Sequence, residues 1–150
     1  MLKAKEIMTV DIITVTPQTT VSDLARLLSE HSIGGAPVVD ASGRLLGVVT
    51  ESDLIDQTKK IHIPTVIAIL DSLIFLESPD KMEKDIRKFA GSTVEDIYSK
   101  NPLTVDEDTP LDEVATIMAE KKVHTLPVIR GELLVGVIGK GDIIKTLISS

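Results

Sequence analysis

The sequence has no cysteine and few aromatic residues: one Tyr, two Phe and no Trp. The absence of cysteine excludes a disulfide framework, a thiolate metal site and a cysteine nucleophile. The scarcity of aromatic rings leaves little for stacking on nucleic-acid bases. The formal net charge of −7 opposes general affinity for a nucleic-acid backbone, because that affinity depends on basic surface. We therefore expect no nucleic-acid partner.

Long apolar runs are also missing. The N-terminus, MLKAKEIMTVD, has no apolar signal core. The most apolar segment, residues 61–77, contains Pro64 and Asp71 and is shorter than the roughly 20 apolar residues that a membrane span needs. We expect a soluble, cytoplasmic protein with no membrane association. With 150 residues, 43% of them hydrophobic, the chain can bury the core of one compact domain or of two small halves.

What the chain does contain is an internal repeat. DIITVTPQTTVSDLARLLSEHSIGGAPVVD begins at Asp11, and NPLTVDEDTPLDEVATIMAEKKVHTLPVIR begins at Asn101. Each copy predicts a short strand (IITV or PLTV), an amphipathic helix, two strands joined by a turn, and a closing helix. In the second copy Thr109 is expected to cap the helix, with Pro110 at its first position. The predicted fold class is α/β (α+β), with two β-α-β-β-α repeats. The helical faces consist of Val21, Leu24, Ala25 and Leu28 in one copy, and Leu111, Val114, Ala115 and Met118 in the other.

A connector without a counterpart separates the repeats. We expect the first repeat at 1–57, a helical connector at 58–91 and the second repeat at 92–150. The apolar connector face should be buried in a homodimer or against the repeats, since it would otherwise be a large exposed patch. That face contains Val66, Ile67, Leu70, Leu73 and Ile74.

Two blocks of similar sequence, GVVTESD at 47–53 and GVIGKGD at 136–142, each follow an apolar stretch. One interpretation is structural, because T-x-x-D after a strand is a helix capping box. The other is a ligand site, in which the aspartate accepts hydrogen bonds from two vicinal hydroxyls. In the second block Gly139 replaces the capping threonine, yet Asp142 persists. Capping alone would not require that aspartate, so the pattern favours a ligand site at Asp53 and a weakened one at Asp142.

The duplication, the element order and the blocks APVVD…GVVTESDL and LPVIR…GVIGKGDI resemble a stand-alone tandem pair of CBS domains, the cystathionine β-synthase type of regulatory module. The resemblance implies two repeats packed about a pseudo-twofold axis. It also implies two clefts for an adenine nucleotide (AMP, ADP or ATP) or S-adenosylmethionine, pairing into a homodimer, and action on a regulated protein that the sequence does not identify. The nucleotide would be a regulatory ligand, not a required cofactor.

The resemblance also implies site residues. Asp53 would hold a ribose, and Thr50 would contact the ribose or a phosphate. His124 could meet a phosphate, and Lys122, Lys140 and Arg130 are further candidate cations. We assign no metal site, because His31 and His62 have no partners at ligand spacing. The adenine walls would be Gly34, Gly35, Ala36 and Pro37 with Leu103 and Thr104 for the Asp53 cleft, and Val123, His124, Leu126 and Pro127 with Ile12 and Ile13 for the Asp142 cleft.

Three classes of function remain open. A regulatory nucleotide-binding module fits best. A structural or dimerisation module that has lost its ligand is the alternative, since Gly139 and the few candidate cations favour it. An enzyme fits worst, because the sequence shows no nucleophile-base pair, metal cluster or paired carboxylates.

Overall fold

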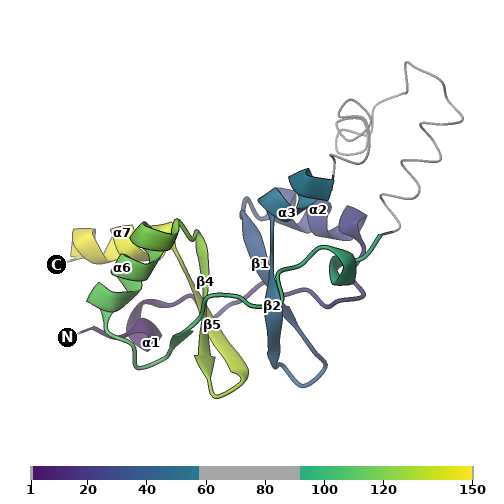
Figure 1. Cartoon of the computed structure of the whole chain (residues 1–150). Coiled ribbons are helices and arrows are strands. Elements are labelled where there is room, and N and C mark those ends of the chain that lie inside the picture. The colour runs from purple at the N-terminus through teal and green to yellow at the C-terminus, as the bar shows by residue number, and fades with distance from the viewer. Residues whose placement is uncertain (1, 58–91, 150) are drawn as a thin grey trace, which may run out of the picture.

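The computed structural model describes residues 2–57 and 92–149 and contains two similar halves (Figure 1). The predicted mixed fold class is confirmed, while the predicted connector helices lie outside the described residues. A short element precedes each duplicated segment that begins at Asp11 or Asn101: the helix α1 (Ala4–Ile7) and the 3-10 helix η2 (Val94–Asp96). The repeats consist of α2 (Val21–Glu30), β1 (Gly35–Val39), β2 (Leu45–Thr50) and α3 (Glu51–Gln57), and of β3 (Val105–Asp106), α6 (Leu111–Lys121), β4 (Thr125–Arg130), β5 (Leu133–Gly139) and α7 (Lys140–Ser149).

Each repeat builds its sheet on an antiparallel hairpin. β1 pairs with β2, and β4 pairs with β5. In the second repeat β3 adds a parallel strand, because Glu107 donates its backbone N–H to the carbonyl of Ile129 at 3.1 Å. The equivalent position in the first repeat is Pro17, which has no N–H to donate. The predicted strand IITV is therefore reduced to one parallel bridge, between Val15 and Val38.

The helices present the predicted apolar faces to the sheets. Thr20 caps α2 by accepting a hydrogen bond from the N–H of Asp23 at 3.1 Å. The predicted Thr109 cap of α6 is wrong, because Pro110 occupies the N-cap position without a side-chain hydrogen bond. The Thr109 hydroxyl instead accepts from the N–H of Asp106 at 3.1 Å and closes the turn before the helix. The buried helix residues are Val21, Leu24 and Leu28 in α2, and Val114 and Met118 in α6.

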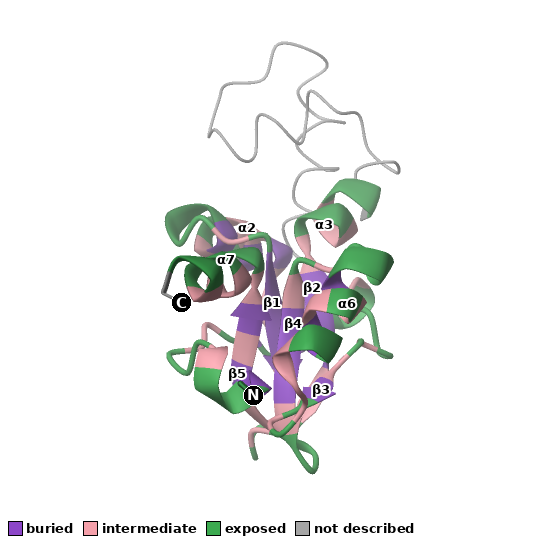
Figure 2. Cartoon of the chain, turned by 90° about the vertical axis from the view of Figure 1, so that its left-hand side faces the viewer, coloured by how far each residue is buried: buried purple, intermediate pink, exposed green. Residues whose placement is uncertain are grey.

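Each half has its own hydrophobic core, and the core residues gather on the strands and the inner helix faces (Figure 2). Ala4, at the start of the predicted first repeat, packs in the core of the second repeat with Val114 and Leu126. Val94, at the start of the predicted second repeat, packs in the core of the first repeat with Leu24. The packing therefore crosses the linear boundaries, and the division at 57 and 92 stays a prediction.

Gly47 and Gly136, the first residues of the two similar blocks, each lie where another segment of the chain packs closely against the strand. Ser99 pairs with Val48 through backbone hydrogen bonds of 2.9 and 3.1 Å. A Cβ atom at Gly47 would meet the Ser99 carbonyl and the Tyr98 ring, the latter at 2.6 Å, and one at Gly136 would meet the Met8 side chain. Gly47 is required because backbone occupies the space of a Cβ, whereas a Cβ at Gly136 would force the Met8 side chain to shift.

Candidate functional site

Asp53 lies at the start of α3 in a complete capping box. The Thr50 N–H donates to Oδ2 of Asp53 at 2.8 Å, and the Thr50 hydroxyl donates to the same oxygen at 3.2 Å. In return the Asp53 N–H donates to the Thr50 hydroxyl oxygen at 3.3 Å. The capping interpretation of the block is confirmed. Within the described residues, Oδ1 of Asp53 accepts no hydrogen bond, so the cap leaves this oxygen available.

Asp142 keeps half of the same arrangement. The Gly139 N–H donates to Oδ2 of Asp142 at 2.8 Å, although Gly139 has no hydroxyl to return the bond. The Thr9 hydroxyl donates to Oδ1 at 3.1 Å. Capping therefore accounts for Asp142 as well, contrary to the expectation from the sequence, because the Gly139 amide needs an acceptor whatever its side chain. Unlike Asp53, Asp142 has both carboxylate oxygens engaged.

A cavity of about 390 Å³ adjoins Asp53, and we call it the Asp53 cleft. Three segments form its wall: the end of β2 with the start of α3, the linker at 99–103, and residues 122–125, which are the turn before β4 and the first residue of that strand. Gly34 completes it. Of the residues predicted for this cleft, it contains Thr50, Asp53, Gly34 and Leu103.

A second cavity, of about 430 Å³, adjoins Asp142, and we call it the Asp142 cleft. The equivalent segments form its wall: the start of α7, the segment that includes Thr9 and 11–13, and residues 32–35, which are the turn before β1 and the first residue of that strand. Ile12, Ile13 and His124 line this cleft at their predicted places. The two clefts thus follow the duplication of the chain.

The structure assigns some predicted wall residues to the other cleft. Gly35 and Pro37, predicted beside Asp53, line the Asp142 cleft. Val123, predicted beside Asp142, lines the Asp53 cleft. The physical reason is that β1 and β4 lie side by side at the centre of the molecule, so the start of each strand lies between the clefts (Figures 1 and 2). Three residues consequently line both clefts: Gly34, His124 and Thr125.

Four other predicted wall residues line neither cleft. Ala36, Leu126 and Pro127 are fully buried in the strands. Thr104 lines a separate cavity of about 580 Å³, together with Arg44, which pairs with Asp40 and Glu132. Whether the remaining wall residues contact a ligand stays a prediction.

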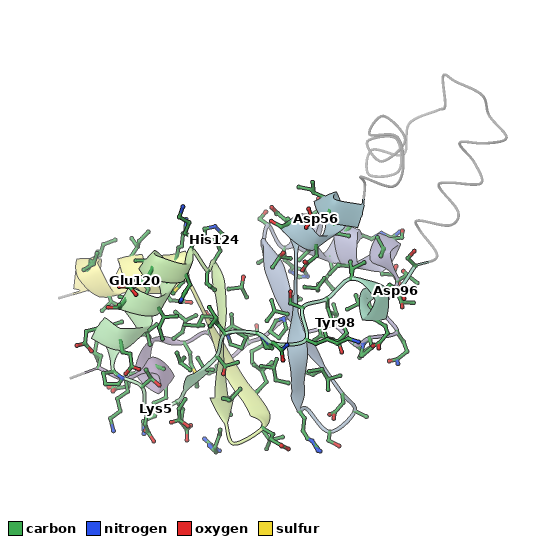
Figure 3. The ribbon with its side chains drawn as sticks, in the orientation of Figure 1. Lys5, Asp56, Asp96, Tyr98, Glu120 and His124 are labelled. Carbon is green, nitrogen blue, oxygen red and sulfur yellow. The ribbon has the colours of Figure 1, made fainter. Side chains whose placement is uncertain are left out.

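The candidate cations differ in their positions. Lys122 lines the Asp53 cleft and has a left-handed backbone with φ of 53°, at the end of α6. His124 lies in the turn between α6 and β4 (Figure 3) and borders both clefts. Lys140 is exposed and lines neither cleft. Arg130 lines neither cleft and donates two hydrogen bonds of 2.9 Å to Glu107, and these bonds lower the pKa of that carboxyl.

Sequence reasoning missed several polar residues of the clefts. Asn101 lines the Asp53 cleft, and Asp11, at the equivalent position of the repeat, lines the Asp142 cleft. The alignment of the repeats pairs these two residues, and it could have indicated their places. Other missed residues are Glu51, Ser52 and Ser99 in the first cleft, and Thr9 and Ser32 in the second.

Metal clusters and membrane-spanning helices are absent from the described part of the chain. In 2–57 and 92–149, no three His, Cys, Asp or Glu side chains lie close enough to hold a metal ion. No helix in those two ranges combines the length and the apolar character that crossing a membrane requires.

Comparison with known sequences identifies one family. The model of the CBS domain matches residues 4–60 and again 94–149. The chloroplastic CBS domain-containing protein CBSX1 of Arabidopsis thaliana is 31% identical over 144 residues, which are 90% of this chain and 58% of CBSX1. Protein MJ1426 of Methanocaldococcus jannaschii is 29% identical over 135 residues, 84% of this chain and 80% of that protein. The chain thus spans little more than half the length of CBSX1.

Solved structures share the fold. The crystal structure of CBSX2 in complex with AMP superposes with a TM-score of 0.76 at 26% identity, covering 99% of this chain and 98% of the other. The CBS domain pair of protein MJ0100, in complex with 5′-methylthioadenosine and S-adenosyl-L-methionine, has a TM-score of 0.70 at 23% identity. It covers 99% of this chain and 97% of the other, and at this identity the likeness concerns the fold alone.

Proposed function

Because this chain belongs to the CBS domain family, with one domain in each repeat, we propose that it is a regulatory module that binds an adenine nucleotide or S-adenosylmethionine. It would sense metabolite or energy state and act on a partner protein without catalysing a reaction. The carrying observation is the pair of equivalent clefts, each beside an aspartate that follows a strand. Their volumes of about 390 and 430 Å³ lie within the range of small-molecule sites, about 300–1,000 Å³.

At the Asp53 cleft each group has a proposed role. Oδ1 of Asp53 accepts hydrogen bonds from ribose hydroxyls, while Oδ2 keeps the cap. Leu103 offers apolar surface to the adenine, and Lys122 and His124 offer cationic or donor groups to a phosphate. The AMP complex of the similar CBSX2 supports an adenosyl ligand.

We propose a cytoplasmic homodimer as the working form. In the described part of the chain, α7 exposes three large apolar side chains, Ile144, Leu147 and Ile148, at 55%, 74% and 78% of their surface. A row of exposed apolar residues on one helix is typical of an interface. The predicted connector face lies outside the described residues.

A structural module without a ligand is the second candidate. The complete capping box favours it, because Thr50 and Asp53 already satisfy one another without a bound molecule.

Calorimetric titration with AMP separates the candidates. We expect affinity in the micromolar to millimolar range for the wild type and a loss of more than tenfold for Asp53→Ala, since hydrogen bonds to a charged acceptor contribute about 1.5–3 kcal/mol each. Asp142→Ala should matter less. Asp23→Ala, an exposed residue in the first turn of α2, is the control of equal charge change.

Asp53→Asn distinguishes the two roles of Asp53. Its amide oxygen still accepts from the Thr50 N–H, so stability should fall less than for Asp53→Ala, while AMP affinity falls almost as far because the anionic acceptor is gone. If the wild type gives no heat with AMP, ADP, ATP or S-adenosylmethionine at millimolar concentration, the ligand-binding function is wrong and the structural module stands.

A further inference from the structure

The two clefts carry different charges at equivalent positions of the repeat. Where the Asp53 cleft has Asn101, the Asp142 cleft has Asp11. Where the Asp53 cleft has Lys122 in a left-handed turn with φ of 53°, the Asp142 cleft has Ser32 in the same kind of turn with φ of 51°. The backbone is thus similar in the two clefts, while both differences in residue type make the Asp142 cleft more negative than the Asp53 cleft.

The ionisable groups of the second cleft are few. Its described wall has the carboxylates of Asp11 and Asp142, with His124 at the boundary and no Lys or Arg side chain. The first cleft also has two carboxylates, Glu51 and Asp53, but it has the Lys122 ammonium beside them. A dianionic phosphate in the Asp142 cleft would therefore meet two carboxylates without a permanently cationic side chain on the described wall.

Asp11 is an exposed residue on the wall of the Asp142 cleft. Thr9 binds Asp142 directly, and Asp11 follows two residues later, so the two carboxylates belong to the same wall. The cleft has a volume of about 430 Å³, and a phosphate bound in it would share that space with the Asp11 carboxylate. Because Asp11 is exposed, solvent weakens the repulsion between its carboxylate and a phosphate, so the expected effect on affinity is severalfold.

We propose that the Asp142 cleft selects an adenosine derivative whose 5′ group is neutral or cationic and rejects phosphorylated nucleotides, with Asp11 as the residue that sets this preference. The inference depends on the proposed adenosyl-binding function of the clefts and adds a difference between them. The module then binds two classes of ligand simultaneously, a nucleotide in the Asp53 cleft and a phosphate-free nucleoside in the Asp142 cleft.

Three probes with the same base and ribose test the proposal: AMP, adenosine and 5′-amino-5′-deoxyadenosine. They are titrated into Asp53→Ala protein, which isolates the Asp142 cleft, and into isotopically labelled wild type. The amide shift of Gly139 reports the Asp142 cleft, because this N–H donates to Asp142. The wild-type measurement keeps the test valid if Asp53→Ala is poorly folded.

At the Asp142 cleft we expect the amine to bind at least as tightly as adenosine, and adenosine about fivefold or more tighter than AMP. Asp11→Asn should bring the adenosine and AMP affinities to within about twofold of each other. Asp23→Asn, which makes the same change in net charge on exposed α2, should leave their ratio unchanged.

Three results would overturn the proposal. Equal binding of AMP and adenosine at the Asp142 cleft removes the selectivity, and an unchanged ratio in Asp11→Asn removes the role of Asp11. In both cases AMP binding at Asp53, and with it the proposed function, is untouched. Absence of binding by all three probes at both clefts overturns the inference together with the proposed function.

Discussion

The Thr9 hydroxyl donates a hydrogen bond of 3.1 Å to Asp142, at the start of the last helix of the chain. The segment that contains Thr9 docks on the second repeat along its length. The N–H of Ala4 donates to the Thr109 carbonyl at 2.8 Å, and Thr9 pairs with Val137 through bonds of 2.8 and 3.0 Å. The first residues of the chain are therefore structural parts of the second half.

Ala4→Asp tests this packing. Ala4 is fully buried in the second core, so the variant places an unpaired charge there, and we expect the free energy of unfolding to fall by about 3–5 kcal/mol. Val10→Asp is the matched control, because Val10 is 68% exposed and should change stability by no more than about 0.5 kcal/mol. Urea unfolding followed by circular dichroism measures both. Similar stability of the two variants would show that the segment does not dock.

Gly47→Ala tests the close crossing of the linker over β2. The new methyl group would overlap the Ser99 carbonyl and the Tyr98 ring, and we expect a loss of about 1–3 kcal/mol in thermal or urea unfolding. Gly141→Ala is the control, since a Cβ at that position would have nothing within 4 Å and alanine favours the helix. An unchanged stability of Gly47→Ala would contradict the crossing.

The features that could be predicted from the sequence are those that depend on residues close together along the chain. The apolar spacing of α2, the Thr50–Asp53 capping box and the hairpins are visible in the order of the residues, because each involves a few positions along one element. Met8 contacts Gly136, and Tyr98 contacts Gly47, across long separations in the sequence. Such contacts leave no periodic pattern along the chain from which they could be predicted. The same limit applies to Gly35 and Val123, which the family resemblance placed beside Asp53 and Asp142 respectively, whereas each lines the other cavity.

The pair of Arg130 and Glu107 predicts a pH dependence of stability. Hydrogen bonds from Arg130 lower the pKa of Glu107 in the folded chain below its ordinary value of 4.5. A carboxyl whose pKa is lower in the folded state than in the unfolded state stabilises the folded protein at pH values above its unfolded-state pKa. This contribution is lost as the pH falls through the folded-state pKa.

The stability difference between wild type and Glu107→Gln should therefore be largest near neutral pH and shrink below the ordinary pKa of 4.5. Arg130→Gln removes the cause of the shift, so its difference from the wild type should shrink in the same pH range. Urea unfolding from neutral pH to about pH 3 measures both differences. A difference independent of pH would contradict the ion pair.

Light scattering tests the proposed homodimer. The wild type should be a dimer, and a double change of Ile144 and Ile148 to Glu should shift it towards monomer, because these exposed residues lie one helical turn apart on α7. Leu70→Glu tests the predicted connector face in the same way. Val10→Glu changes an exposed apolar residue elsewhere and serves as control. A monodisperse wild-type monomer would contradict the dimer.

Lys122 provides the test of phosphate recognition at the Asp53 cleft. Lys122→Asn removes the cation and keeps a residue that tolerates the left-handed backbone at φ of 53°. We expect AMP affinity to fall about three- to tenfold while adenosine affinity stays the same, since only AMP carries a charge for the ammonium to attract. Lys121→Gln, in the exposed last turn of α6, controls for net charge. High salt should reduce the difference between wild type and Lys122→Asn, because screening weakens an attraction between partly exposed charges. An equal loss of AMP and adenosine affinity would mean that Lys122 shapes the turn and does not recognise the phosphate.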